Sequence, residues 1–205
     1  MLKKALFATV LVGLSPVVLA APLDGFTVKA GVSVLNPTKE SDLTVGGALV
    51  KDVKASTEAN FTPSVEYRFA DTPFSVELLL AAPFKHQVKA AGLGEIATVK
   101  HLPPTITAKY NLPTMASFTP YVGVGATVFI PWDEKSPLGK LKADNAVGAA
   151  AQIGVNFKPA DAKNWGVFAD VRYADLKTDL ELNGADIGSL KINPVVATLG
   201  YSYNF

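Results

Sequence analysis

Hydrophobic and polar residues alternate along eight segments of this 205-residue chain. The clearest is the carboxyl-terminal one, where Leu199, Tyr201, Tyr203 and Phe205 alternate with small or polar residues. A period of two is typical of a β-strand with one apolar and one polar face. The other seven segments are residues 26–34, 61–69, 74–82, 105–112, 118–130, 147–157 and 165–173. The chain is therefore predicted to be all-β.

The connections between these segments alternate between short turns and long loops. The short ones are residues 71–73, 113–117 and 159–164, and the long ones are residues 36–60, 85–98, 131–145 and about 176–191. Parts of the last long connection, about residues 176–191, are expected to extend the strands beyond a bilayer. An even strand number with short turns at one end is typical of outer-membrane barrels. The pattern predicts an eight-stranded antiparallel transmembrane β-barrel whose short turns face the periplasm.

The alternation alone leaves open which face points inward, because a soluble lipocalin-like barrel would enclose its apolar face. The charged residues favour the membrane. A Lys or Arg facing hydrocarbon at the midplane would cost about 2–4 kcal/mol, so charges on the polar face should point into the barrel. The predicted interior polar network is Lys29, Glu66, Arg68, Glu77, Lys109, Asp170 and Arg172. The alternative, ion selectivity in an aqueous pore, needs more than eight strands.

Composition and the amino terminus agree with an exported membrane protein. Hydrophobic residues make up 49% and the mean hydropathy is +0.25, yet after the amino terminus no run is long enough for a spanning helix. Lys3 and Lys4, an apolar run over 5–14 and small residues before Ala21 predict a signal peptide over 1–20, followed by the barrel over 21–205. A helical anchor is the alternative, but Gly13, Ser15 and Pro16 interrupt the run.

Charge and residue chemistry exclude several functions. Loss of the two signal-peptide lysines takes the formal net charge from +1 to −1, which gives no reason to expect nucleic acid. There are no cysteines, and the two histidines, His86 and His101, lack the spacing of metal ligands. Neither histidine has a recognisable nucleophile beside it in the sequence. We expect no metal, no cofactor and no enzymatic activity.

Short motifs spread over nearly the whole mature chain resemble one family, outer membrane protein W, which includes alkane-uptake barrels. Each is weak alone, but they occur in the family's order. They are Ala81-Ala82-Pro83-Phe84-Lys85-His86, Leu102-Pro103-Pro104-Thr105-Ile106, Pro120-Tyr121-Val122-Gly123-Val124-Gly125, Asp170-Val171-Arg172-Tyr173 and Ile192-Asn193-Pro194. The first long loop, residues 36–60, is less family-like.

The resemblance implies an eight-stranded barrel in the bacterial outer membrane that passes small hydrophobic molecules. These would use an apolar tunnel in the extracellular half that opens sideways into the outer leaflet. The implied partners are outer-membrane lipid, lipopolysaccharide and the hydrophobic solute. Phe205 at the end of alternating aromatics resembles the signal that the barrel assembly machinery reads. A monomer is expected.

Prolines in or beside the strand segments offer one physical hint of a lateral exit. Each removes a ladder N–H, and a closed barrel has no edge that tolerates the loss. They are Pro63, Pro83, Pro103, Pro104, Pro120 and Pro194. One interpretation is that they mark strand ends and bulges. The other is that Pro83, Pro103 and Pro104 leave neighbouring strands unpaired and so form a lateral gap.

Apolar residues toward the long-loop end are a second hint, because exposed loops rarely contain so many. They form either a pocket for a small apolar ligand or a core that holds the loops together. The candidates for a hydrophobic pathway are Leu35, Leu49, Leu79, Phe84, Leu93, Phe129, Trp132, Leu138 and Phe168. The function favoured is passive uptake of hydrophobic molecules. The alternative is a structural or adhesive barrel whose loops bind envelope or host partners.

Overall fold

The computed structural model describes residues 24–205, so the predicted signal peptide over 1–20 lies outside the described residues. The described chain forms fifteen β-strands. Within that range no helix is long and apolar enough to cross a membrane.

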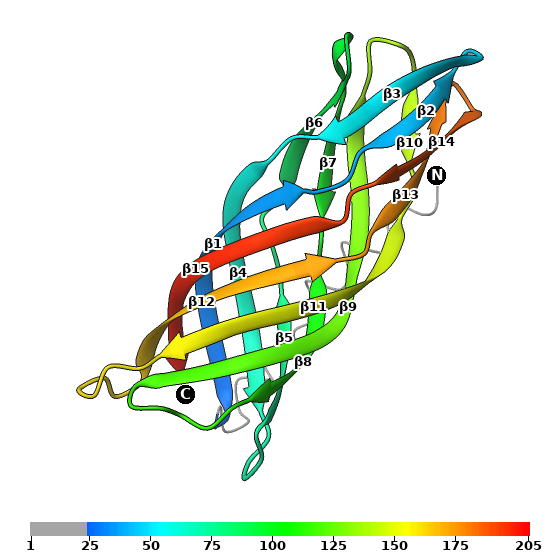
Figure 1. Ribbon diagram of the computed structural model, residues 1–205. Helices are drawn as coiled ribbons and strands as arrows, with labels where there is room; N and C mark the ends of the chain where they lie inside the picture. Colours follow the sequence, from blue (N-terminus) through cyan, green and yellow to red (C-terminus); the bar gives the residue numbers. More distant parts are fainter. Residues whose placement is uncertain (1–23) are drawn as a thin grey trace, which may run out of the picture.

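Eight of the strands form a closed antiparallel barrel (Figure 1). They are β1 (Phe26–Pro37), β4 (Glu58–Arg68), β5 (Phe74–Leu79), β8 (Thr105–Asn111), β9 (Phe118–Lys135), β11 (Ala146–Phe157), β12 (Trp165–Ala174) and β15 (Pro194–Asn204). The ring closes where β15 pairs with β1, from Thr27 opposite Asn204 to Pro37 opposite Pro194. Closure gives each of the eight strands a pairing partner on both sides. The predicted eight-stranded barrel is confirmed.

Apolar side chains cover the outside of this barrel. On β12 every second residue is exposed, so that Val167, Val171 and Tyr173 point outward while Asp170 and Arg172 are buried. Val124 and Leu199 are 68% and 67% exposed, which would be unfavourable in water over a surface of this size. The orientation is the reverse of a lipocalin-like barrel, and the outer surface is suited to hydrocarbon.

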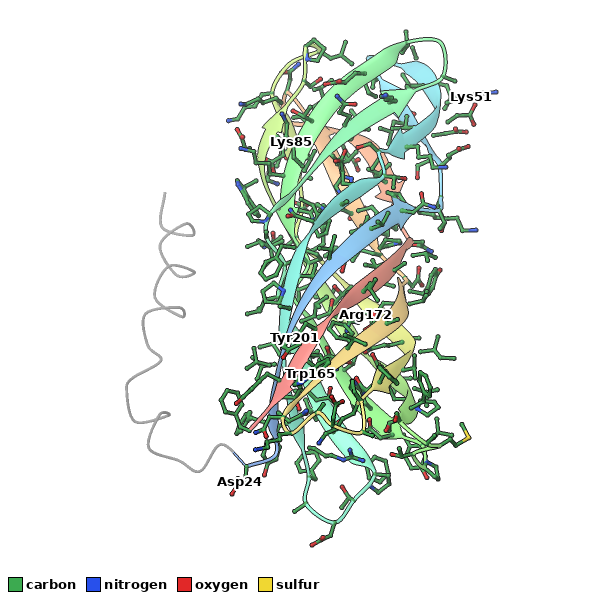
Figure 2. The ribbon with its side chains drawn as sticks, turned by 90° about the vertical axis from the view of Figure 1, so that its left-hand side faces the viewer. Asp24, Lys51, Lys85, Trp165, Arg172 and Tyr201 are labelled. Atoms are coloured by element: carbon green, nitrogen blue, oxygen red, sulfur yellow. The ribbon has the colours of Figure 1, made fainter. Side chains whose placement is uncertain are left out.

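Paired aromatic rings surround the end of the barrel that carries the short turns. Adjacent strands place their rings 4.8 Å apart in Phe118–Phe157, 5.4 Å apart in Phe74–Tyr110 and 5.8 Å apart in Trp165–Tyr201. Aromatic girdles of this kind lie at the membrane–water interface. Figure 2 shows Trp165 and Tyr201 toward one end of the molecule and Lys51 and Lys85 toward the other.

The other seven strands extend the barrel at its opposite end (Figure 1). They are β2 (Ser41–Val45), β3 (Ala48–Ala55), β6 (Phe84–Ala90), β7 (Gly94–Leu102), β10 (Leu141–Ala143), β13 (Lys177–Leu182) and β14 (Ala185–Lys191). β9 passes through both parts, since it pairs with β8 up to Thr127 and with β7 from Ile130 to Lys135. We call the part that contains these seven strands and the end of β9 the hairpin half, and the rest the barrel half.

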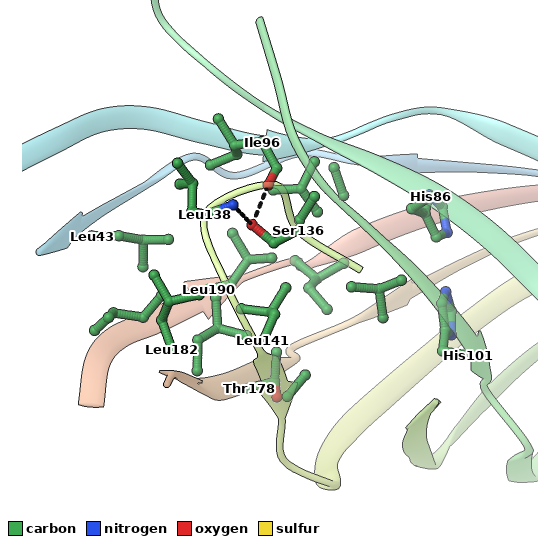
Figure 3. Close-up of a pocket in the computed structure, with 18 of the residues that line it drawn as sticks. Leu43, His86, Ile96, His101, Ser136, Leu138, Leu141, Thr178, Leu182 and Leu190 are labelled. Carbon is green, nitrogen blue, oxygen red and sulfur yellow. Dashed lines mark hydrogen bonds between the residues drawn. The ribbon is translucent and has the colours of Figure 1, made fainter. Parts of the chain in front are cut away.

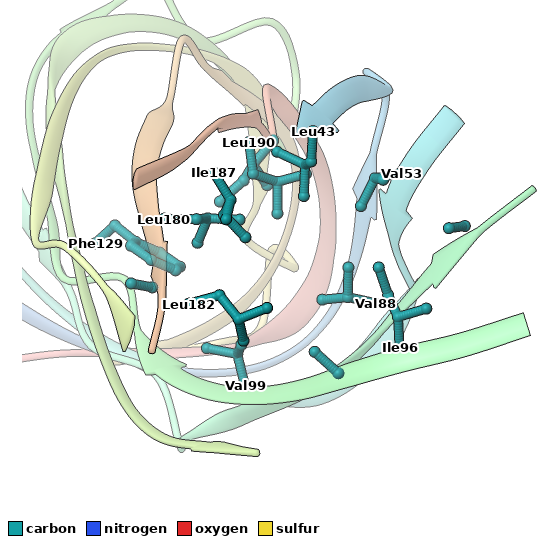
Figure 4. Packing of buried hydrophobic residues seen from close by; sticks show 14 of the residues in the cluster. Leu43, Val53, Val88, Ile96, Val99, Phe129, Leu180, Leu182, Ile187 and Leu190 are labelled. Atoms are coloured by element: carbon teal, nitrogen blue, oxygen red, sulfur yellow. The ribbon is translucent and has the colours of Figure 1, made fainter. Parts of the chain in front are cut away.

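The prediction of long loops over 36–60, 85–98 and 131–145 is therefore wrong in large part, whereas the strand structure expected within 176–191 is present. Much of each of these segments is β-strand, and three of them contain or contribute to antiparallel hairpins. The physical reason is that the segments bury an apolar face of their own, which rewards regular backbone pairing. Leu43 of β2, Val88 of β6, Phe129 of β9, Leu180 of β13 and Leu190 of β14 pack into one cluster (Figure 4).

Glycines let bulky rings fit inside the narrow barrel half. A Cβ on Gly200 would lie 2.6 Å from the Phe168 ring, and one on Gly154 would lie 2.5 Å from the Tyr121 ring. A residue larger than glycine at either position would clash with the neighbouring ring. Both positions therefore need glycine for close approach, whatever their backbone angles.

Candidate functional site

A network of ion pairs fills the interior of the barrel half. Glu77, which is fully buried, accepts hydrogen bonds from Lys109 Nζ, Arg172 Nη2 and Gln152 Nε2, each at 3.1 Å. Glu66 lies 2.6 Å from Lys29 Nζ and 2.8 Å from Lys109 Nζ. Ser64 donates a further hydrogen bond to Glu77. The contacts of Glu77 join five strands of the ring, β4, β5, β8, β11 and β12, through one central carboxylate.

The charges of this network balance. The three carboxylates of Glu66, Glu77 and Asp170 face the three cations of Lys29, Lys109 and Arg172. Asp170 also accepts a hydrogen bond from Tyr121 Oη at 3.1 Å, and Lys109 Nζ lies 3.7 Å from the centre of the Tyr121 ring. Buried ions need such partners, because each loses its hydration on burial. The network leaves no unbalanced charge to attract ions of one sign.

Arg68 does not belong to this network, contrary to prediction. Its side chain is exposed, and the structure gives it no ion pair among residues 24–205. Arg68 is the last residue of β4, so its inward parity directs it to the open mouth at the short turns. There it lines a polar cavity of about 150 Å³ with Lys29, Glu66 and Asn111.

The hairpin half encloses an upper cavity of a different character (Figure 3). Its volume is about 50 Å³, and its walls are almost entirely aliphatic or aromatic. Leu43, Val99, Phe129 and Leu180 contribute from four separate hairpins or strands. The predicted pathway residue Leu138 also lines it, although about half of its surface is exposed.

A lower cavity of about 40 Å³ lies between the upper cavity and the ion-pair network. It shares His101 with the upper cavity and Arg172 with the network. The predicted residues Leu35, Leu79 and Phe84 line its walls. Apolar space therefore continues downward until it meets the charged groups of the barrel half.

The wall of the lower cavity contains a break in the strand ladder. β5 pairs with β8 as far as Leu79 opposite Thr105, and β6 pairs with β7 from Phe84 opposite His101. Between these points no backbone hydrogen bond joins described residues 80–83 to 102–104. We call this break the ladder gap.

The backbone on each side of the ladder gap bonds to its other neighbour instead. Leu80 N and Ala82 N donate to Pro63 O and Phe61 O of β4, at 2.8 and 2.9 Å. On the far side, Val128 N of β9 donates to Pro104 O at 2.9 Å. Pro83, Pro103 and Pro104 have no N–H with which to bridge the gap. All three of the predicted lateral-gap residues thus lie at the break.

Some predicted pathway residues lie elsewhere. Leu49 and Leu93 are 58% and 61% exposed beside the hairpin turns, and Trp132 is half-buried without lining either cavity. Phe168 is buried within the barrel half, where its ring lies 5.0 Å from Lys29 Nζ. Residues beside turns are free to point outward, and Trp132 has the opposite parity to Phe129 on β9. The position of an apolar residue toward the long-loop end therefore does not indicate whether it lines a cavity.

Sequence reasoning missed most of the upper cavity, whose further lining residues are Val45, Val88, Ile96, Leu180, Leu182, Ile187 and Leu190. For one strand of this lining, the sequence contains a recognisable pattern. Phe84, His86, Val88 and Ala90 alternate with Lys85, Gln87 and Lys89, which is the pattern of a two-faced strand. The outer face of this segment is charged rather than apolar, so the segment does not match the pattern of a lipid-facing strand.

The two histidines are buried between the cavities as stacked neutral rings. Their ring centres lie 4.9 Å apart at an angle of 16°, and His86 Nδ1 donates to Ser56 O at 2.6 Å. They lie outside the hydrocarbon, because the neighbouring Lys85 and Lys100 form a cross-strand pair on the outer face. Burial lowers the pKa of His86, and burial together with His86 lowers that of His101 to about 3. Among residues 24–205 no three His, Cys, Asp or Glu side chains are grouped to hold a metal ion.

An apolar outer surface, an aromatic girdle and an ionised interior within eight closed strands define an outer-membrane β-barrel protein. The sequence profile of the OmpW family matches residues 24–205. Outer membrane protein W of Vibrio cholerae is 33% identical over 96% of both chains. The chain belongs to the OmpW family.

Two solved structures have the same fold. The crystal structure of OprG from Pseudomonas aeruginosa is similar with a TM-score of 0.74 and 26% identity, over 89% of this chain and 96% of that one. The solid-state NMR structure of AlkL in lipid bilayers has a TM-score of 0.71 and 22% identity, over 91% and 93%. In sequence, AlkL of Ectopseudomonas oleovorans is 25% identical over 80% of this chain and 74% of its own length.

Proposed function

We propose that this barrel lets small hydrophobic molecules enter passively from outside the cell and leave sideways into the outer leaflet. The solute would enter among the hairpins and pass through the upper cavity to the lower one. It would leave through the ladder gap between residues 80–83 and 102–104. No energy source is required, because the concentration gradient drives the movement.

The observation that carries this proposal is the position of the ladder gap. It lies in the wall of an apolar cavity whose floor is an ion-pair network. An apolar solute cannot replace the interactions of buried ions, so the network is a barrier to further descent. The broken ladder offers a route that costs no inter-strand hydrogen bonds.

Entry requires movement of the hairpins. Cavities of about 50 and 40 Å³ would hold only part of a solute with more than a few carbon atoms. β2 and β14 lie side by side in different sheets, and Lys191 N donates to Ser41 Oγ between them at 2.8 Å. Separation of these two hairpins would break few hydrogen bonds and open the upper cavity to the outside.

Cross-linking across the ladder gap tests the exit. The chain has no cysteine, so A81C/P103C can be joined by a short thiol-specific linker without background reaction. Joined variants should lose most uptake of n-undecane by cells that carry the barrel, relative to cells with an empty vector. The control is V76C/A108C, whose residues face each other in the intact part of the β5–β8 ladder. Its cross-linking should leave uptake unchanged.

Two outcomes would count against the proposal. Equal uptake by linked and unlinked A81C/P103C would overturn the lateral exit. Uptake by the unmodified protein no greater than that of the empty vector would overturn transport itself and favour a structural or adhesive barrel. We further propose that the barrel functions as a monomer among lipopolysaccharide and is inserted by the barrel assembly machinery, which recognises Phe205.

A further inference from the structure

The floor of the lower cavity contains one arginine whose donors are only partly used. Arg172 is 5% exposed, and its Nη2 donates to Glu77 and Asp170, each at 3.1 Å. Its Nε and Nη1 are also buried but have no hydrogen-bond partner among the described residues. Arginine is always protonated and can only donate. A buried cationic donor without an acceptor is unfavourable unless something supplies one.

The other polar groups of the lower cavity are already satisfied or bond to one another. Thr105 Oγ1 and Thr127 Oγ1 lie 2.8 Å apart, and Thr105 also donates to Pro103 O. Thr62 Oγ1 lies 2.6 Å from Ser33 Oγ. His101 at the opposite end holds the only other unpartnered nitrogen of this lining, within the described residues. Arg172 is therefore the strongest polar feature that a molecule in this cavity would meet.

We propose that Arg172 binds the oxygen of a neutral acceptor group, such as a ketone or aldehyde carbonyl, at the end of a hydrocarbon chain. This inference rests on the proposed function and names the class of solute that it favours. The carbonyl would lead into the lower cavity and accept a hydrogen bond from Nε or Nη1, while the chain stays in apolar surroundings. A hydrogen bond to a charged donor is stronger than one between neutral groups.

The charge balance of the network favours a neutral head group over an anionic one. Arg172 already pairs with Glu77 and Asp170, and the three cations and three carboxylates of the network sum to zero charge. A carboxylate would add an uncompensated negative charge to this buried site, whereas a carbonyl would not. A pure alkane would leave the two nitrogens as they are. The site thus distinguishes carbonyl-bearing chains from alkanes by a single interaction.

Paired uptake measurements test this inference. Cells that carry the barrel are given 2-undecanone and n-undecane, and the ratio of their initial uptake rates is compared between variants. R172K keeps a cation for Glu77 and Asp170 but loses the unpartnered guanidinium donors, so the ratio should fall about tenfold. The matched control is R68K, because Arg68 is exposed at the other end of the barrel half and should leave the ratio unchanged.

A second measurement remains decisive if R172K folds poorly. Arg68 and Arg172 are the only arginines of the chain, so protein labelled with ¹⁵N-arginine in lipid nanodiscs gives two side-chain Nε signals. Adding 2-undecanone should shift the Arg172 signal and leave that of Arg68, whereas n-undecane should shift neither.

The outcomes separate this inference from the function on which it rests. Unshifted Arg172 signals together with equal ratios for wild type and R172K would overturn the role of Arg172 while leaving hydrophobic uptake intact. Failure of both solutes to enter faster than with an empty vector would overturn the proposed function itself.

Discussion

The two halves of this molecule are opposite in polarity, inside and out. In the barrel half the interior is ionised and the surface apolar, as Glu77 and Val171 illustrate. In the hairpin half the interior is apolar and the surface charged, as Val88 and Lys85 illustrate. β9 changes character along its own length, from buried Tyr121 beside Asp170 to buried Phe129 beside the upper cavity.

This inversion shows that one alternating pattern can serve two solvents. Each strand needs only two different faces, and the surroundings decide which face turns outward. Hydrocarbon selects the apolar face and water the polar one. The level at which the faces exchange, near the ladder gap, therefore marks the upper limit of the hydrocarbon. A cavity at that level is well placed to pass apolar molecules between the two environments.

The largest expected effect comes from removing the central carboxylate of the barrel half. Glu77→Ala would leave Lys109 and Arg172 without a main partner in a buried site, and the free energy of unfolding should fall by about 3–5 kcal/mol. Urea unfolding in lipid vesicles measures it. Glu40→Ala is the control, because Glu40 pairs with Lys54 at 3.6 Å on the exposed surface and should cost less than about 1 kcal/mol. Equal losses would mean that the network contributes no more than a surface ion pair.

Lysine substitutions on the outer faces test the inversion directly. Val171→Lys places a charge against hydrocarbon and should destabilise the barrel by about 2–4 kcal/mol. Gln87→Lys makes the same addition on the exposed face of β6 and should change stability by less than about 0.5 kcal/mol. The same unfolding assay compares them. A large loss for Gln87→Lys would place β6 within the hydrocarbon and contradict the proposed boundary.

Acid should weaken the hairpin half through its buried histidines. His101 has a pKa of about 3 in the folded protein and about 6.5 when unfolded, so the unfolded state binds more protons between these values. Stability is thus retained above pH 6.5 and lost as the pH falls toward 3. Between pH 7.5 and 4.5 this one group should cost about 2.7 kcal/mol.

The variant His101→Phe isolates that contribution, because a phenyl ring keeps the stack on His86 and Phe129 but cannot be protonated. Carboxylates and His86, which has Glu58 nearby, titrate in both proteins and cancel in the comparison. The variant should lose less stability than wild type over the same pH interval. Identical losses would show that His101 is not held neutral by burial.

Much of the fold could be predicted because strand parity is local. The eight barrel strands, their faces and six of the seven network residues follow from a period of two and the cost of charge in lipid. The prediction for Arg68 was wrong because strand parity gives the direction in which a side chain points but not its depth in the barrel. Arg68 ends β4, where the barrel opens to water. The prediction that the pathway is lined by Leu49, Leu93 and Trp132 failed for a related reason. The apolar character of a residue near a loop does not specify what its side chain faces.

By itself the sequence determined which residues share a face, where prolines remove ladder donors and that the chain belongs in a membrane. Only the tertiary structure decided which faces meet. Glu77 and Arg172 are 95 positions apart, yet ring closure brings them to 3.1 Å. Likewise, the register of β5 and β8 determines that the prolines lie at a gap in the strand ladder beside a cavity. Alternation determines on which face of a strand a side chain lies. Register and ring closure determine which side chains become its neighbours, and both depend on contacts between distant segments.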